Sequence, residues 1–480
     1  MSNFIRNNKY SWLIGLLLTI AIVVIPLIIV LPGQASPSDD PWAFVPDATI
    51  HTDHTYLLEG PYETGQDVTN ACLECHENSS QEMMETVHWS WESEPVELPG
   101  RDEPVTVGKA NQINNFCIGV QGNWPKCTTC HAGYGWEDET FFETATEEDV
   151  DCLACHASGG TYGKGIAGNP LEAVDLVAAA KSVGSPTREN CGGCHFNGGG
   201  GNAVKHGDLD ASLYFPNENI DVHMGLHDFE CITCHQTEGH NIQGRSISVS
   251  FDNENQVYCM DCHNNDLHED ARLNEHIDTV ACQTCHIPAF ALEDATKMEW
   301  DWSQAGEDRD ETDSHVYLKI KGSFVYEEDV RPEYFWYNGI ADRYLLGDVI
   351  DPNEITPINM PQGEINDPEA KIAPFKVHLA TQIYDANFNY FIQPKTVGEG
   401  GYWEDFDWQK ASELGAEVTG LPFSGEYGWA QSTMFWPTTH MVQPASEALQ
   451  CTGCHSEEGI LDWEALGYPG DPMDWGSRFE

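Results

Sequence analysis

The sequence predicts a mainly α-helical fold with a large irregular fraction, in which bound cofactors replace much of the hydrophobic core. Three observations support this prediction. Sixteen of the 17 cysteines lie in eight copies of one five-residue pattern, C-x-x-C-H. The first seven copies begin 23 to 55 residues apart, which leaves little room for a conventional core around each of them. The eighth copy follows 164 residues that lack the pattern and are rich in tryptophan and tyrosine.

Each copy has the chemistry of an attachment site for a c-type haem. Its two thiols can form thioether bonds to the vinyl groups of one porphyrin, and the adjacent histidine becomes an axial ligand of the iron. A zinc site does not require a histidine directly after the second cysteine, and disulfides impose no such spacing. We therefore expect eight covalently bound haem c groups and a compact multihaem cytochrome c fold packed around them. The attachment residues are Cys72, Cys75 and His76; Cys127, Cys130 and His131; Cys152, Cys155 and His156; Cys191, Cys194 and His195; Cys231, Cys234 and His235; Cys259, Cys262 and His263; Cys282, Cys285 and His286; and Cys451, Cys454 and His455.

The first 35 residues contain an apolar run from Trp12 to Leu31, with Arg6 and Lys9 before it. A run of this length spans a bilayer, and basic residues on its amino side place the rest of the chain outside the cytoplasm. We expect residues 1–35 to form a transmembrane signal-anchor, with a cleaved signal peptide as the alternative. The protein is therefore predicted at the periplasmic or extracytoplasmic face of the cytoplasmic membrane.

Three further segments are predicted after this anchor. Residues 36–46 are rich in proline, serine and aspartate and are expected to form a linker. Residues 47–300 form a haem domain that carries the first seven haems. Residues 301–480 form an aromatic-rich wrap that carries the eighth haem and a few short strands. An independent second domain is the alternative for this last segment.

Two local elements are predicted in more detail. Asn169 and Pro170 are a cap and first-turn pair for a helix that runs to about Ser182. Residues Val316 to Tyr326 alternate well enough to predict a short hairpin.

The chain is strongly acidic, with 78 Asp and Glu against 22 Lys and Arg and a net charge of −56. Nucleic acids and anionic membrane surfaces are therefore poor partners. Two explanations fit this charge: a salty habitat, in which ions screen the repulsion between carboxylates, and the docking of positively charged partners. The sequence does not distinguish them. We expect electrons to come from a cytochrome or a quinol dehydrogenase.

Twelve histidines lie outside the motifs, which is enough to provide a distal ligand for all eight irons. A fully bis-histidine protein would be a non-catalytic electron conduit. Lys205 follows the four glycines Gly198 to Gly201, where the backbone can lie close to a flat cofactor. Its side chain could also be the distal ligand of an iron. The histidines expected as distal ligands are His54, His88, His206, His223, His240, His268, His276, His378 and His440.

The motifs occur in the order CLECH, VHW, NNFCIGVQGN before CTTCHAGYGW, DCLACH, CGGCHFNGGGG with VKHGDLD, and finally CTGCH. This order resembles the octahaem tetrathionate reductase family of c-type cytochromes from about Asn70 to His455. The resemblance implies seven bis-histidine haems and one active-site haem with lysine as its distal ligand. It also implies a periplasmic enzyme that reduces tetrathionate to thiosulfate, with nitrite and hydroxylamine as further substrates.

The resemblance assigns the ligand lysine to Lys205, with Lys164 as the second candidate, and the active-site cysteine to Cys117. The catalytic haem is then the second, whose attachment histidine is His131. A neutral amine reaches an iron only if burial lowers its pKa, and after release the ammonium would stabilise an anionic substrate.

Two alternatives to tetrathionate reduction stay open. One is reduction of nitrite or hydroxylamine as the main activity; the other is the non-catalytic conduit. Multihaem nitrite reductases place lysine inside the motif as C-x-x-C-K, whereas all eight motifs here end in histidine. This difference makes membership of the multihaem nitrite reductases a minor alternative.

Overall fold

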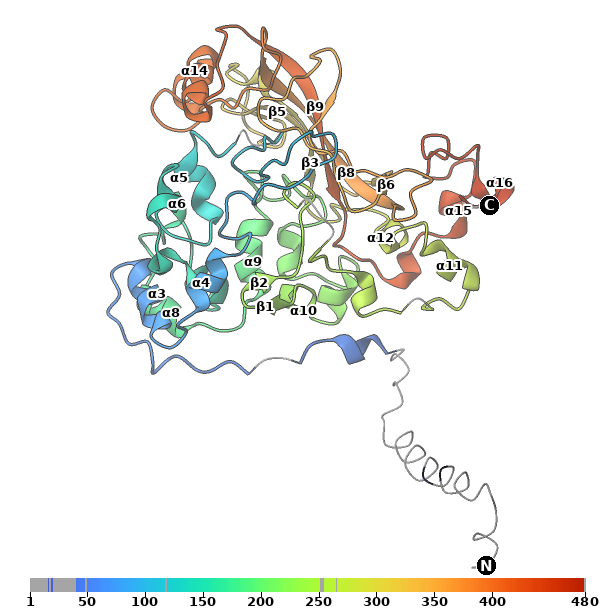
Figure 1. Cartoon of the computed structure of the whole chain (residues 1–480), viewed down its shortest axis with the longest axis horizontal. Helices are drawn as coiled ribbons and strands as arrows, with labels where there is room; N and C mark the ends of the chain where they lie inside the picture. Colours follow the sequence, from blue (N-terminus) through green and yellow to red (C-terminus); the bar gives the residue numbers. More distant parts are fainter. Residues whose placement is uncertain are drawn as a thin grey trace, which may run out of the picture. The chain divides into compact units, whose positions relative to one another are not determined.

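The computed structural model of the protein describes residues 16, 19, 40–47, 50–116, 119–250, 254–264 and 266–478 (Figure 1). The chain divides into two compact units. The smaller comprises residues up to Pro46 together with Cys259–Glu269, and contains 3-10 turns at Pro41–Phe44 and Cys259–Asp261. The larger comprises Asp47–Tyr258 and Asp270–Glu480, and therefore seven of the eight attachment motifs.

The predicted signal-anchor lies outside the described residues, apart from Leu16 and Thr19. Among the residues that the structure describes, no helix combines the length and the apolar character needed to cross a bilayer.

The helices are short, and several carry attachment motifs. They are α3 (Gly65–Leu73), α4 (Ser79–Met84), α5 (Trp124–Cys127), α6 (Phe141–Thr144), α7 (Cys152–His156), α8 (Leu176–Lys181), α9 (Arg188–His195), α10 (Cys231–Cys234), α11 (Ala271–His276), α12 (Cys282–His286), α13 (Tyr402–Asp405), α14 (Trp408–Thr419), α15 (Cys451–Cys454) and α16 (Pro472–Trp475). Both cysteines of a motif lie within one helix in α7, α9, α10, α12 and α15. Residues three apart share a face of a helical turn, so these turns present both thiols to one cofactor.

The helix predicted to begin at Asn169 starts later than expected. α8 begins at Leu176, where the side chain of Asp175 caps the first turn. Pro170 instead forms an isolated antiparallel bridge with Lys164. The predicted start is wrong because Pro170 pairs with Lys164, six residues earlier, and is thereby held outside the helix, while Asp175 provides a favourable cap of its own.

The second half of the chain contains a seven-stranded sheet in the order β4-β5-β3-β8-β9-β7, with β6 also paired to β8. Its strands are β3 (Thr296–Asp301), β4 (Tyr317–Leu318), β5 (Gly322–Glu327), β6 (Glu333–Tyr337), β7 (Thr356–Pro357), β8 (Lys371–Asp385) and β9 (Tyr427–Pro437); β1 (Thr237–Glu238) and β2 (Asn241–Ile242) pair separately. β8 pairs antiparallel with β9 and parallel with β3. Short helices, irregular backbone and strands in the C-terminal region agree with the predicted fold class, although β8 and β9 are longer than expected.

The hairpin predicted between Val316 and Tyr326 is present. β4 and β5 pair antiparallel and close with Leu318 opposite Gly322. Gly322 has a φ of +92°, and a Cβ at this position would lie 2.1 Å from the carbonyl oxygen of Asp301. Glycine is therefore required at this turn.

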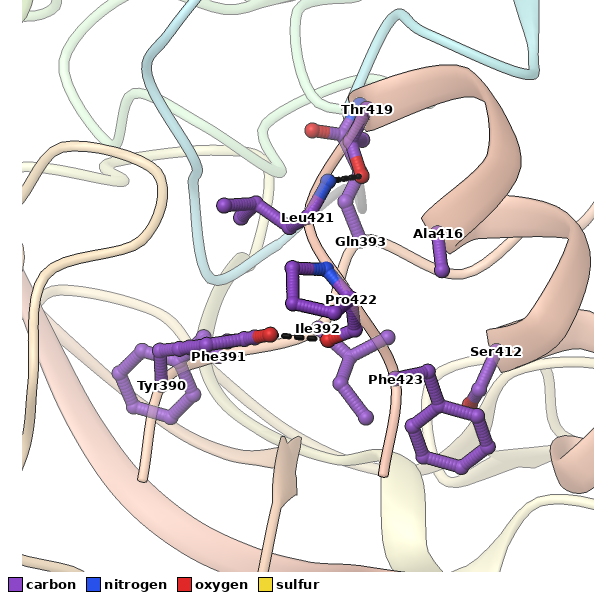
Figure 2. Close-up of a pocket in the computed structure, with 10 residues that line it drawn as sticks. All are labelled: Tyr390, Phe391, Ile392, Gln393, Ser412, Ala416, Thr419, Leu421, Pro422 and Phe423. Atoms are coloured by element: carbon purple, nitrogen blue, oxygen red, sulfur yellow. Dashed lines mark hydrogen bonds between the residues drawn. The ribbon is translucent and has the colours of Figure 1, made fainter. Parts of the chain in front are cut away.

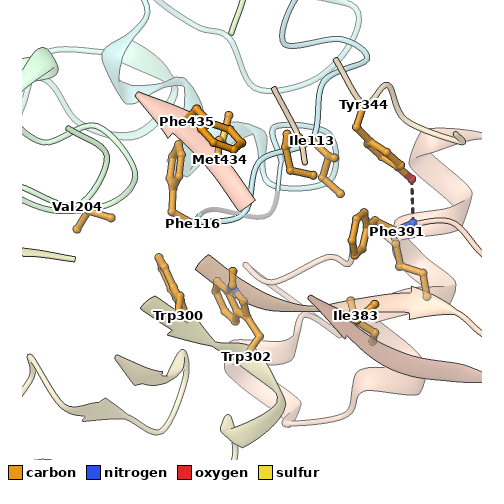
Figure 3. Close-up of a cluster of buried hydrophobic side chains, with 14 of the residues drawn as sticks. Ile113, Phe116, Val204, Trp300, Trp302, Tyr344, Ile383, Phe391, Met434 and Phe435 are labelled. Atoms are coloured by element: carbon orange, nitrogen blue, oxygen red, sulfur yellow. Dashed lines mark hydrogen bonds between the residues drawn. The ribbon is translucent and has the colours of Figure 1, made fainter. Parts of the chain in front are cut away.

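A buried apolar cluster packs the sheet against segments from the first half of the chain (Figure 3). β3 contributes Trp300, which is 2% exposed, while Phe116 and Val204 reach the same cluster from connecting segments. Phe116 stacks obliquely against Trp436 of β9, with ring centroids 5.7 Å apart. Because Val204 directly precedes Lys205, this cluster fixes the segment that carries the predicted ligand lysine.

Candidate functional site

Several of the motif cysteines meet a cysteine of a different motif. The interacting thiol pairs are Cys72 with Cys152, Cys130 with Cys194, and Cys191 with Cys231. α7 and α9 also pack together, since the side-chain amide of Asn190 donates to the carbonyl oxygens of Ala154 and Ala157 at 3.4 and 3.0 Å. The fourth attachment site is therefore adjacent to the second, third and fifth.

Four attachment histidines face a histidine from elsewhere in the chain. The ring centroids are 6.3 Å apart for His54 and His76, 6.1 Å for His88 and His195, 6.2 Å for His235 and His440, and 6.2 Å for His276 and His455. A histidine nitrogen lies about 2 Å from a bound metal ion, so imidazoles on opposite sides of one iron have centroids about 6 Å apart. These residues therefore fit the first, fourth, fifth and eighth haems, and their four distal members are all among those expected from the sequence.

Hydrogen bonds orient attachment histidines for metal binding. Nδ1 of His156 donates to the carbonyl oxygen of Gly184 at 3.0 Å, and Nδ1 of His455 donates to Asp471 at 2.6 Å. A carbonyl or carboxylate oxygen only accepts, so Nδ1 carries the proton and Nε2 keeps the lone pair for an iron. The donor chemistry of these sites thus fits an axial ligand.

The other expected distal histidines occupy different surroundings. The charge of His240 acts on His156, which makes His240 suitable for the third site. His206 lies against Trp436, with ring centroids 5.0 Å apart. The roles of His206, His223, His240, His268 and His378 stay predictions.

His378 is fully buried on β8, and Asn115 fixes its tautomer. The amide nitrogen of Asn115 donates to the carbonyl oxygens of His378 and Ser432, so its Oδ1 faces the imidazole and accepts from Nδ1 at 3.0 Å. Burial and then the charges of Lys376 and Lys297 hold the pKa of His378 well below its usual value. Its Nε2 therefore presents a lone pair, and this atom has no hydrogen-bond partner in the described part of the chain.

Lys205 is partly buried beside the aromatic face of Trp436, with its Nζ 4.6 Å from the ring centroid. Within the part of the chain that the structure describes, no carboxylate forms an ion pair with this amine. Burial, and then the charge of Lys109, lower the pKa of Lys205 to about 7. The neutral amine, which is the form that binds a metal ion, is therefore accessible near neutral pH.

Lys164, the second candidate, is held in a buried ion pair. Its Nζ lies 2.5 Å from Asp151, and the two side chains are 8% and 0% exposed. Tyr134 and Tyr162 each donate a hydroxyl hydrogen bond of 2.8 Å to the same carboxylate. The structure therefore distinguishes the two lysines, because Lys164 has a carboxylate partner and Lys205 has none among the described residues.

His131, the predicted attachment ligand of the catalytic haem, is enclosed by aromatic side chains. The surrounding ring centroids, at 4.7 to 6.0 Å, belong to Trp89, Trp136, Phe141 and Phe142. Burial lowers the pKa of His131 to about 4, so its ring is neutral. The positive charge of Lys164 also lowers the pKa of His131. The assignment of Lys205 to this iron stays a prediction.

Cys117 lies outside the described residues. Its neighbour Phe116 contacts both His378 and Trp436, with ring centroids 6.1 and 5.7 Å apart. The sequence-based site did not include Trp436 or Lys376. Strand periodicity could have indicated Lys376, because it lies two residues before His378 and therefore on the same face of β8.

A small pocket lies between α14 and the adjoining chain segments (Figure 2). Its lining is mostly apolar and consists of Tyr390, Phe391, Ile392, Gln393, Ser412, Ala416, Thr419, Leu421, Pro422 and Phe423. No cysteine, histidine or lysine lines it, so it is separate from the candidate haem ligands.

Comparisons with known proteins bear directly on this arrangement. A crystal structure of octaheme cytochrome c from Shewanella oneidensis matches with a TM-score of 0.83 and 49% sequence identity, covering 88% of this chain and 98% of that chain. The chain belongs to the octahaem c-type cytochromes. The predicted multihaem cytochrome c fold is thereby confirmed, and the match agrees with the resemblance noted from the motifs. As a c-type cytochrome, the protein functions in electron transfer outside the cytoplasm.

Two family models also match parts of this octahaem cytochrome. Residues 297–458 match the model described as cytochrome c bacterial, and residues 71–157 match cytochrome c554 and c-prime. An uncharacterized protein from Archaeoglobus fulgidus is 24% identical over 247 residues, which is 41% of this chain and 82% of that protein. The two family models support covalently bound haem c in both halves of the chain.

The purified, fully matured protein is expected to carry eight covalent haems, because all eight motifs are complete. Intact-mass spectrometry would measure the added mass, and a pyridine haemochrome assay would give the haem-to-protein ratio independently. A matured sample with six or fewer haems would contradict the assignment.

Proposed function

We propose that this octahaem cytochrome reduces tetrathionate to two thiosulfate ions at one haem whose distal ligand is Lys205. The haem concerned is the second, attached through Cys127 and Cys130 with His131 as its axial ligand. The other seven haems have two histidine ligands and deliver electrons to it. We further propose that the N-terminal helix anchors the protein to the membrane and that a cytochrome or a quinol dehydrogenase supplies the electrons.

The observation that carries this proposal is the environment of Lys205. A desolvated ammonium without a carboxylate partner is unfavourable, whereas a neutral amine bound to a metal ion, or an ammonium beside an anion, is not. Its Nζ lies over the face of Trp436, 4.6 Å from the ring centroid, and forms no ion pair with a carboxylate among the described residues. The buried pair of Lys164 and Asp151 shows the ordinary alternative, in which a lysine is neutralised by a carboxylate.

The protein groups have distinct tasks in this reaction. When bound, the haem supplies an iron that accepts and passes on single electrons. As a neutral amine, Lys205 would be a ligand for this iron, and as an ammonium it would bind the negative charge of the substrate. Two electrons break the central S–S bond of tetrathionate and give two thiosulfates, with no proton consumed.

The thiol contacts support a route for these electrons. Cys130 of the second motif meets Cys194 of the fourth, and Cys191 of the fourth meets Cys231 of the fifth. The fourth haem would therefore connect the catalytic haem with the rest of the chain. His88 and His195 face each other across this site, so it can be saturated by two histidines and serve electron transfer alone.

A turnover assay tests the proposed reaction. The reduced protein should be oxidised by tetrathionate, with two thiosulfates formed for each two electrons consumed. Nitrite and hydroxylamine are assayed in parallel under the same conditions. Faster turnover of either nitrogen compound would reassign the main activity, and no turnover of any of the three would leave the electron conduit as the better description.

A further inference from the structure

The segment that carries Lys205 is held by a buried side chain from the sheet. Lys376 of β8 is 1% exposed, and its Nζ donates to the carbonyl oxygens of Val204 at 3.0 Å and Lys205 at 3.3 Å. The same group donates to the hydroxyl of Thr296 at 2.6 Å. A lysine ammonium has three hydrogen-bond donors, and these three acceptors match them in number.

Thr296 extends the contact to the neighbouring peptide groups. Its hydroxyl donates to the carbonyl oxygen of Ala203 at 2.7 Å and lies 3.4 Å from that of His206. The amide of Lys297 adds a second hydrogen bond to Ala203, at 3.2 Å. The carbonyl groups of Ala203, Val204 and Lys205 are therefore bound by β3 and β8, and the carbonyl group of His206 lies beside the hydroxyl of Thr296.

This clamp holds a backbone conformation that the segment would not readily keep alone. Ala203 has a φ of +56°, in the left-handed region that residues with a Cβ rarely adopt. On the other side, a Cβ at Gly207 would lie 2.3 Å from the ring of Phe290, so the chain is confined there as well. Backbone strain of this kind persists only where surrounding contacts determine the conformation.

The side chain of Lys205 leaves the clamped backbone in a defined direction. Its Cδ lies 3.2 Å from the position a Cβ would take at Gly198, and its Nζ lies over Trp436. Trp436 is itself paired with Lys376 across β8 and β9. The clamp, on β3 and β8, and the aromatic surface that receives the lysine, on β9, are thus built on adjacent strands of one sheet.

We infer that Lys376 and Thr296 are positioning residues that fix the 203–206 segment so that the amine of Lys205 reaches its binding position. This inference rests on the proposed function, in which Lys205 is the distal ligand. Neither residue needs to touch the substrate. Loss of the clamp should therefore change the ligand state of one haem and the turnover number, while the Michaelis constant and the haem content stay close to those of the wild type.

The test variants are Lys376→Met and Thr296→Val. The controls are Thr296→Ser, which keeps the hydroxyl, and Lys371→Met, which removes a partly exposed lysine from the same strand. Low-temperature electron paramagnetic resonance and near-infrared magnetic circular dichroism report the ligands of each low-spin haem. Lys376→Met and Thr296→Val should lose the lysine-ligated signal and lower turnover by at least about tenfold, because misplacement of a reactive group by about 1 Å has effects of that order or greater. Thr296→Ser and Lys371→Met should retain both.

Lys205→Ala separates this inference from the proposed function. If Lys205→Ala removes the distinct signal but Lys376→Met and Thr296→Val keep it at wild-type turnover, the clamp is overturned and the ligand assignment stands. If Lys205→Ala leaves all haem signals unchanged, the ligand assignment fails and the positioning role fails with it. Thr296→Val removes only one hydroxyl, so it gives a result even if Lys376→Met does not fold.

Discussion

Replacement of Lys205 by alanine is expected to open one iron to water and to lower tetrathionate turnover by at least about tenfold, equivalent to roughly 1.4 kcal/mol on the barrier. Alanine supplies neither an amine ligand nor a cation for the anionic substrate. The remaining haems keep their histidine ligands, so their spectra should not change. Magnetic circular dichroism of the oxidised protein would detect one new high-spin haem, and steady-state kinetics would give the rate.

Lys410→Ala is the matched control, because it removes an exposed lysine from α14, outside the candidate site. Its haem spectra and turnover should equal those of the wild type. Equal turnover in Lys205→Ala and the wild type, with eight low-spin haems in both, would contradict the catalytic assignment.

Replacement of Asp151 by asparagine is expected to cause the largest loss of stability, about 3–5 kcal/mol of the free energy of unfolding. The substitution keeps the shape of the side chain but leaves the ammonium of Lys164 without its counter-charge at a site where both groups are buried. The hydroxyl hydrogen bonds from Tyr134 and Tyr162 also lose a charged acceptor. Denaturant titration followed by circular dichroism would measure the change.

Asp308→Asn tests an exposed ion pair in the same chain, since Asp308 is 92% exposed where it meets Lys319. The Asp308→Asn substitution should change the free energy of unfolding little, because solvent screens exposed ion pairs. The double variant Asp151→Leu with Lys164→Met should recover part of the lost stability, because it removes both buried charges. A stability of Asp151→Asn indistinguishable from the wild type would show that the pair is not structurally important.

Local features of the sequence predicted those parts of the structure that depend on neighbouring residues. The hairpin around Gly322 follows from alternation and one glycine, both contained within a few residues. The helix near Asn169 was placed too early because Pro170 pairs with Lys164 and Asp175 takes the role of the cap, so two nearby signals competed and the wrong one was chosen. The length of β8 was missed for a different reason, since its pairing with β9 joins segments that are far apart in the chain.

The candidate site shows the same division. The family resemblance ranked Lys205 above Lys164, but burial of a charged group is a property of the folded molecule, so the sequence could not show which of the two amines has a carboxylate partner. The carboxylate of Asp151 makes that distinction, because it pairs with Lys164. In the same way, composition supplied twelve possible distal histidines, whereas the folded chain brings His88 opposite His195 and His440 opposite His235.

The sequence by itself determined the cofactor and its points of attachment, because thioether formation and the adjacent axial histidine require only five contiguous residues. Only the tertiary structure decided which histidines face each other, which attachment sites adjoin, and that Lys376 and Thr296 bind the backbone beside Lys205. The physical reason is that covalent attachment is set by spacing along the chain. Ligand pairing, desolvation and hydrogen bonding depend on distances in space, which the chain acquires only when it folds.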